Sequence, residues 1–135
     1  TNGVDLQSIP FRENIVFTGY VTDIRPVVGS AKICVVPLRM GGGTRLKVLE
    51  ALALGTPVVS TSKGIEGLDL VPGQDVMVAD QPEDFAHAVV SLLNDQALYN
   101  HLRLNGRLAV QQKYGWDYIA HDYEEKLSQW LVNEV

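Results

Sequence analysis

Short apolar runs alternate with amphipathic and glycine-bearing stretches along the chain. Four such runs, at residues 14–18, 32–36, 57–61 and 75–79, are built around consecutive apolar residues rather than around alternating apolar and polar ones. Unbroken apolar runs of this length are typical of strands that are buried on both faces of a sheet. The pattern therefore predicts four short strands at these positions.

Between and after these runs, apolar residues recur at the spacing of a helix. Five helices are expected, in segments that begin near Asp23, Thr44, Pro82, Asp95 and Asp117. The first should be a short piece that reaches about residue 29, and the second should span residues 44–54. Each aspartate is expected to cap the helix that follows it, and Gly55 is expected to end the second helix.

Alternation of strands and helices favours an α/β fold with a Rossmann-like parallel sheet of about four strands, flanked by helices. Such a sheet is small, and we expect it to be part of a Rossmann-like unit rather than a whole one. In open parallel sheets, ligands bind beyond the carboxyl ends of the strands. Three loops are expected at that edge, at residues 19–21, 37–45 and 60–69.

Composition narrows the class of protein and of partner. The chain has 135 residues and a mass of 14.8 kDa, which suits one domain. Its 16 acidic and 11 basic residues argue against nucleic acid or an anionic membrane as the main partner. The single cysteine, Cys34, excludes a disulfide framework and is expected to be a buried, inert thiol. No metal-ligand spacing, signal peptide or membrane span is evident.

Three consecutive glycines, Gly41, Gly42 and Gly43, form the most informative loop. Glycine lets the backbone turn tightly, and this turn leads into a helix N-terminus, where free N–H groups favour an anion. Three basic residues flank it, namely Arg39, Arg45 and Lys47. The turn predicts a phosphate or diphosphate site. The alternative is a flexible connection with solvated basic residues, since the sequence matches neither a Walker loop nor G-x-G-x-x-G.

Glu50 is the only charged residue between Val48 and Leu54, on a helix that is otherwise leucine and alanine. A lone buried carboxylate is costly unless it is paired or hydrogen-bonded. Helical spacing directs it along the face that leads to the glycine turn. Glu50 could accept two hydroxyls, as from a ribose, or it could pair with Lys47.

Residues 33–61, ICVVPLRMGGGTRLKVLEALALGTPVVST, resemble the donor-binding signature of the retaining glycosyltransferases with the GT-B fold, known as group 1 or family 4. The flanking text agrees, and YGWDYIAHDYEEKL resembles the C-terminal helix of that family. The resemblance extends over about residues 14–132. It implies the C-terminal, donor-binding domain of an enzyme of hexosyltransferase type, which transfers a sugar from a UDP-, GDP- or ADP-linked donor with retention and without an essential metal or other cofactor.

The resemblance also implies roles for particular residues. Glu50 would bind the ribose hydroxyls, and Tyr20 and Val21 would hold the base. The diphosphate and sugar would be bound by Gly41, Gly42, Gly43, Thr44, Arg45 and Leu46. Lys47 and Glu66 are further candidates for contact with the ligand.

Two departures from the family pattern matter. The family often has a second glutamate that contacts the sugar, and Gly42 occupies that position here. The strand and helix that bring an arginine and a lysine to the diphosphate also have no counterpart before residue 14. We therefore expect residues 1–13 to be a lead-in and residues 14–135 to be part of a donor domain, inactive without its N-terminal acceptor domain.

The expected setting of the full enzyme is cytoplasmic, or peripheral at the inner face of the membrane. Apolar surface around Trp130 would contact the missing domain and would invite self-association of this chain alone. A non-catalytic, Rossmann-like module that binds a nucleotide or phosphate is the alternative function. A sugar-nucleotide epimerase of the same fold ranks lower.

Overall fold

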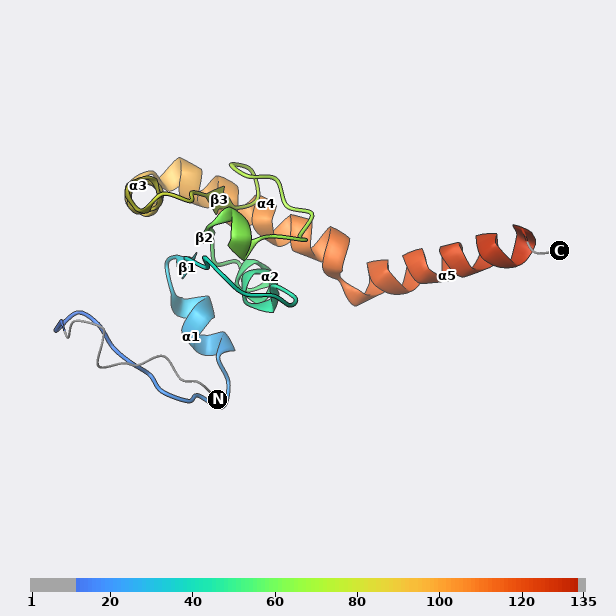
Figure 1. Ribbon diagram of the computed structural model, residues 1–135, viewed down its shortest axis with the longest axis horizontal. Coiled ribbons are helices and arrows are strands. Elements are labelled where there is room, and N and C mark those ends of the chain that lie inside the picture. Colours follow the sequence, from blue (N-terminus) through green and yellow to red (C-terminus); the bar gives the residue numbers. More distant parts are fainter. Residues whose placement is uncertain (1–11, 134–135) are drawn as a thin grey trace.

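The computed structural model describes residues 12–133 (Figure 1). Its elements follow one another in the order α1 (Arg25–Ser30), β1 (Cys34–Val36), α2 (Leu46–Ala53), β2 (Val58–Ser60), the short 3₁₀ helix η2 (Ser62–Gly64), β3 (Met77–Val78), α3 (Pro82–Asn94), α4 (Gln96–Tyr114) and α5 (Trp116–Asn133). Helices and strands alternate from α1 to α3, as the hydrophobic pattern predicts. The expected lead-in at residues 1–13 lies almost wholly outside the described residues.

The sheet is parallel and has the strand order β1-β2-β3. Val35 pairs with Val59, which in turn pairs with Met77. Both observations confirm the α/β fold with a parallel sheet. Within the described residues, however, the sheet has three strands instead of about four.

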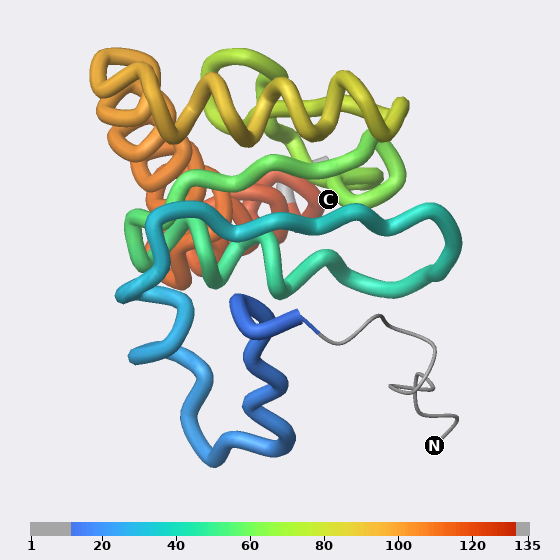
Figure 2. Tube along the Cα trace, turned by 90° about the vertical axis from the view of Figure 1, so that its left-hand side faces the viewer, coloured from blue at the N-terminus to red at the C-terminus, as the bar shows by residue number. Residues whose placement is uncertain are grey.

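The predicted strand at residues 14–18 is wrong. This run forms no ladder with the sheet and belongs to an arm, residues 12–24, that lies beside the domain (Figures 1 and 2). Val16 and Phe17 are exposed there. An apolar run becomes a strand only when a neighbouring strand satisfies its backbone groups, and no such neighbour adjoins it among the described residues.

Local sequence determines several helix ends. Asp95 caps α4, because its carboxylate accepts hydrogen bonds from Ala97 N–H and Leu98 N–H, both at 2.9 Å. Gly55 has φ +76° and ends α2. The N–H of Gly55 bonds to Leu52 O and that of Thr56 to Ala51 O, which is the Schellman arrangement.

Two other predicted caps are displaced. Asp23 lies just outside α1, where Ile24 is the N-cap residue, although Asp23 still accepts a hydrogen bond from Arg25 N–H at 3.0 Å. Asp117 is not a cap, because α5 begins one residue earlier, at Trp116. The acidic side chain of Asp117 instead lies in the first turn of α5, where its negative charge interacts favourably with the positive end of the helix dipole.

The core lies on both faces of the sheet. Val58 and Val59 are both fully buried, and successive side chains of a strand point to opposite faces. One cluster joins Val58 to α2 and α4, and the other joins Val59 to α3 and α4. Figure 2 shows the resulting layers, with α3 on one side of the strands and α2 on the other. The unbroken apolar run of β2 is therefore confirmed as a strand buried on both faces.

The final helix, α5, extends away from the domain (Figure 1). Its apolar side chains are largely exposed, including Trp116, Ile119, Tyr123 and Trp130, the last at 56%. The expected apolar surface around Trp130 is thus present. None of the described helices combines the length and the apolar character that a membrane crossing requires.

Candidate functional site

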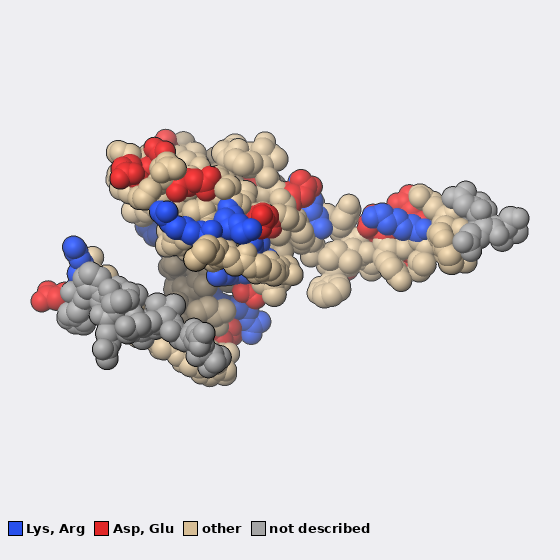
Figure 3. All heavy atoms as spheres, in the orientation of Figure 1, with Lys and Arg blue, Asp and Glu red and all other residues tan. Residues whose placement is uncertain are grey.

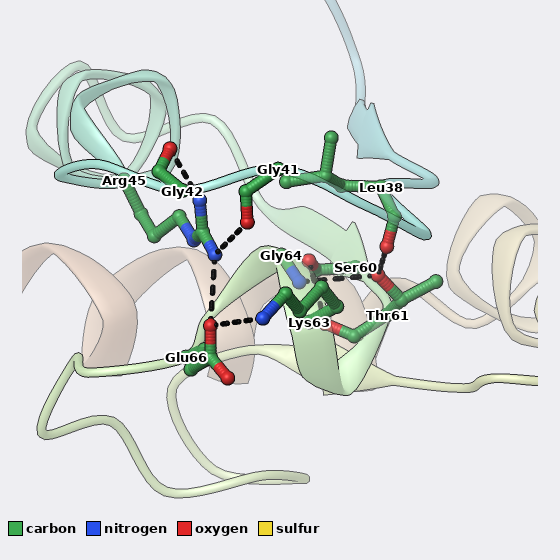
Figure 4. A network of polar contacts seen from close by, with 9 residues as sticks. All are labelled: Leu38, Gly41, Gly42, Arg45, Ser60, Thr61, Lys63, Gly64 and Glu66. Atoms are coloured by element: carbon green, nitrogen blue, oxygen red, sulfur yellow. Dashed lines mark hydrogen bonds and ion pairs between the residues drawn. The ribbon is translucent and has the colours of Figure 1, made fainter.

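The carboxyl ends of the parallel strands β1 and β2 place two loops side by side. The first runs from Pro37 to Arg45 and contains the glycine turn, and the second runs through η2 to Glu66 (Figure 4). Across the same edge, Figure 3 shows a band of basic side chains in the middle of the domain and acidic ones over α3. At the edge predicted to carry chemistry, the two loops are therefore joined by the hydrogen bond from Arg45 to Glu66.

The glycine turn is exposed and needs glycine at two of its three positions. Gly41 has φ +132° and Gly43 has φ +84°, values that L side chains rarely adopt. Helix α2 follows with Arg45 as its N-cap residue and no side-chain cap. Among the described residues, no hydrogen-bond partner is present for the N–H groups of Leu46 and Lys47. Free N–H groups at a helix N-terminus suit an anion.

Arg45 lies inside the protein, with only 5% of its surface exposed. Its guanidinium donates to Gly42 O at 3.0 Å, to Gly41 O at 3.3 Å and to Glu66 Oε2 at 3.0 Å (Figure 4). The side chain is therefore directed away from the outer surface of the turn, and its three partners belong to this chain.

Glu66 accepts from two cations. Besides Arg45, its Oε2 accepts from Lys63 Nζ at 2.6 Å. The hydrogen bond from Lys63 and the charge of Lys63 hold the pKa of Glu66 below its ordinary value of 4.5, with a smaller contribution from Arg45. At neutral pH the carboxylate is ionised and joins the two loops.

This network predicts a pH-dependent stability. Because the pKa of Glu66 is lowered in the folded protein, ionised Glu66 stabilises the fold above pH 4.5, and that contribution disappears as the pH falls through the lowered value. Thermal unfolding of the wild type and of Glu66→Gln should therefore differ at pH 7 and converge at acidic pH. Salt should reduce the difference, since Glu66 is exposed. An equal difference at pH 3 and pH 7 would contradict this assignment.

The second loop is fixed by groups that sequence reasoning missed. Thr61 Oγ1 donates to Leu38 O and accepts from Gly64 N–H at 3.1 Å, which caps η2. A Cβ on Gly64 would lie 2.1 Å from Ser60 Oγ, so only glycine fits. The available signal was a threonine followed three residues later by glycine, which is typical of a capped turn.

Glu50 is exposed, so the expectation of a buried carboxylate is wrong. The helical repeat turns Val48, Ala51 and Leu52 into the core and places Glu50 on the outer side of α2. The alternative, an ion pair between Glu50 and Lys47, is not found either, although the structure describes both residues. Glu50 borders a shallow apolar groove whose other walls are Leu46, Leu49, Ala53, Val110, Tyr114, Trp116 and Ile119.

Tyr20 and Val21 lie in the arm at residues 12–24 rather than in the network. The side chain of Tyr20 is 93% exposed, and within the described residues no hydrogen bond connects it to residues 41–46. The exposed Thr44 and Lys47 flank the start of α2. The structure thus brings together the glycine turn, Arg45 and Glu66, and leaves Tyr20 apart from them.

Beside the network, the strand ends border a cavity of about 210 Å³, lined by Pro37, Arg39, Thr61, Asp80, Pro82 and Phe85. Asp80 accepts from Ser62 N–H at 2.8 Å and from Ser62 Oγ at 2.9 Å, which ties this wall to η2.

In the part of the chain that the structure describes, no cluster of histidine, cysteine or acidic residues could hold a metal ion. Cys34 is half-buried, and burial raises its pKa, so the thiol is protonated at neutral pH.

Comparison with known proteins gives two kinds of match. A family model described as "Glycosyl transferases group 1" matches residues 4–95. The uncharacterized glycosyltransferase MJ1607 of Methanocaldococcus jannaschii is 31% identical over 117 residues, which are 82% of this chain and 29% of that protein. The putative glycosyltransferase YtcC of Bacillus subtilis is 27% identical over 118 residues, 84% of this chain and 29% of that protein. No solved structure matches. The chain thus spans under a third of either relative.

Proposed function

This chain belongs to the group 1 glycosyltransferases, and on that premise we propose that it forms the donor-binding part of an enzyme that transfers a sugar from a nucleotide-sugar to an acceptor hydroxyl, with retention. The observation that carries the proposal is the exposed glycine turn at the carboxyl edge of the sheet, which leads directly into the uncapped N-terminus of α2. Ligands of open parallel sheets bind at this edge.

Each part of the donor has a candidate partner. The N–H groups of Gly42, Gly43 and Leu46 and the positive end of α2 hold the diphosphate. Glu50, exposed on the second turn of α2 and free of ion pairs within the described chain, accepts the ribose hydroxyls. Tyr20 and Val21 contact the base, which requires the arm to approach this edge.

The chemistry requires no protein nucleophile. The diphosphate leaves with its growing negative charge stabilised by the N–H groups of the turn and by nearby basic side chains. The acceptor hydroxyl attacks from the face that the diphosphate leaves, and the departing phosphate takes its proton. The acceptor is bound by an N-terminal domain, and the exposed apolar face of α5 docks on that part of the full-length enzyme. The 135 residues alone bind the donor without transferring the sugar, because transfer needs both domains to exclude water.

A nucleotide titration tests this proposal. Addition of UDP, GDP or ADP should shift the NMR signals of residues 41–46 and of Glu50. Glu50→Gln should weaken binding of the preferred nucleotide about tenfold, because hydrogen bonds to a charged group contribute about 1.5–3 kcal/mol. Its thermal stability should not change, since Glu50 is exposed and unpaired within the described chain.

Glu125→Gln is the matched control, because Glu125 is an exposed carboxylate on α5 and loses the same charge. It should bind nucleotides as the wild type does. If Glu50→Gln binds nucleotides and pyrophosphate as tightly as the wild type, the nucleoside makes no contact with Glu50. The alternative function, a phosphate-binding module without transferase chemistry, would then be favoured.

A further inference from the structure

We propose that Arg45 is a positioning residue, which holds the glycine turn with the N–H groups of Gly42 and Gly43 facing outward and does not itself contact the phosphate. The inference rests on the proposed function in taking a diphosphate as the ligand of the turn. It differs from the sequence-based expectation, in which the side chain of Arg45 faces that ligand.

The first step is the direction of the peptide groups. The guanidinium of Arg45 donates hydrogen bonds to the carbonyl oxygens of Gly41 and Gly42, at 3.3 and 3.0 Å. In a trans peptide the C=O of one residue and the N–H of the next point in opposite directions. The two carbonyls are turned inward to Arg45, so the N–H groups of Gly42 and Gly43 are turned outward. Successive N–H groups presented in this way form a concave site for an anion.

The second step is the anchor on the other loop. Glu66 binds Arg45 at 3.0 Å and lies 21 residues further along the chain. Glycine alone would leave the turn with many accessible conformations, since it restricts the backbone least of all residues. The link from Arg45 to Glu66 ties the turn to η2, which Thr61 fixes in place. The buried cation therefore selects one conformation of an intrinsically flexible turn (Figure 4).

The third step concerns why Arg45 does not bind the ligand directly. Its guanidinium is ion-paired with Glu66, and only 5% of its side chain is exposed. To reach a ligand outside the turn, the guanidinium would have to break its three hydrogen bonds within the chain. Arginine suits the observed role because its planar fork donates to several acceptors at once, which a lysine ammonium cannot reproduce in the same geometry.

Removal of Glu66 distinguishes the two roles by the sign of its effect. If Arg45 contacted the phosphate, Glu66→Ala would free the cation, remove a nearby negative charge and strengthen anion binding. If Arg45 positions the turn, the same change releases the anchor and weakens binding. Asp69→Ala is the matched control, because Asp69 is an exposed carboxylate near Glu66 in sequence that pairs with Lys113 at 3.0 Å.

The experiment uses the full chain and inorganic pyrophosphate, which does not depend on the identity of the base. We expect Glu66→Ala and Arg45→Lys to weaken pyrophosphate binding about three- to tenfold, which corresponds to about 0.7–1.4 kcal/mol. Nitrogen-15 relaxation of the free proteins should show greater motion of Gly41, Gly42 and Gly43 in both variants, and Asp69→Ala should change neither property. Glu66→Ala leaves the buried side chain of Arg45 in place, so it remains informative if Arg45→Lys fails to fold.

Two results would overturn the inference. One is pyrophosphate binding by Glu66→Ala that equals or exceeds that of the wild type. The other is unchanged motion of the turn in Glu66→Ala. A wild-type protein that binds no pyrophosphate would instead reject the proposed function, and the relaxation data would still decide whether Arg45 holds the turn.

Discussion

Replacement of Leu102 by alanine should lower the free energy of unfolding by about 2–5 kcal/mol. Leu102 is fully buried in α4 and packs in a cluster with Val59 of β2 and with Ala88 and Leu92 of α3. Removal of its side chain leaves a cavity where three elements meet, and the lining residues lose contacts that the surrounding structure can restore only in part. Urea denaturation followed by circular dichroism measures the change.

Leu104→Ala is the matched control, because Leu104 lies two residues further along the same helix and is 61% exposed. The two substitutions remove the same atoms from helical positions and differ in burial. The control should change stability by no more than about 0.5 kcal/mol. Equal effects of the two substitutions would mean that α4 does not pack on α3 and β2 as described.

Gly106→Ala should destabilise the protein by about 2 kcal/mol, as a tight-packing penalty of about 3 kcal/mol exceeds a gain of about 1 kcal/mol in helix propensity. A Cβ at Gly106 would lie 2.6 Å from Asp75 O and 2.7 Å from Leu52 Cδ2. The Asp75 carbonyl cannot easily withdraw, because the buried side chain of Asp75 accepts a hydrogen bond from Val71 N–H at 2.9 Å. The helix would have to move away from the sheet.

The control for this prediction is Gly29→Ala. Gly29 is also helical, in α1, and a Cβ there would meet nothing within 4 Å. The same substitution should therefore stabilise the protein by about 0.5–1 kcal/mol, the usual difference between the two residues in a helix. Chemical denaturation of both variants should give shifts of opposite sign, and a stabilising Gly106→Ala would show that α4 lies further from Asp75.

The Gly106 contact also bears on the candidate site. Leu52, which it touches, is on the buried side of α2, and the N-terminus of α2 follows the glycine turn. A displaced α4 would therefore disturb the base on which α2 rests. We expect the loss of stability in Gly106→Ala to be accompanied by weaker binding of pyrophosphate. Leu102 packs on the other face of the sheet, so Leu102→Ala should not weaken pyrophosphate binding in this way.

Much of the fold follows from local sequence. The runs around Val35, Val59 and Met77 form strands because each is apolar and pairs with a parallel neighbour. Of the described strands only β2 is buried on both faces, since Val35 of β1 is 50% exposed and β3 is half-buried. Asp95 and Gly55 mark helix ends because a carboxylate accepts free N–H groups and glycine tolerates positive φ. The family resemblance was equally local, since its most specific part is one continuous string around and after the glycine turn.

The run at residues 14–18 marks the limit of such reasoning. Its composition is that of a strand, but a strand also requires a neighbour, and none is present for it among the described residues. The expectation that Glu50 is buried was wrong for a related reason. Its apolar neighbours in sequence suggested burial, whereas the helical repeat places it on the outer side of α2.

The sequence by itself determined the class of fold, the glycine turn and the presence of a helix after it, because each depends on residues that are adjacent along the chain. The helix begins at Leu46, two residues later than the expected Thr44. Only the tertiary structure decided where the charges lie. Arg45 and Glu66 are 21 residues apart and meet because parallel strands end at the same edge of a sheet. Whether a cation is buried with a partner or exposed to a ligand depends on that meeting, which the order of the residues does not specify.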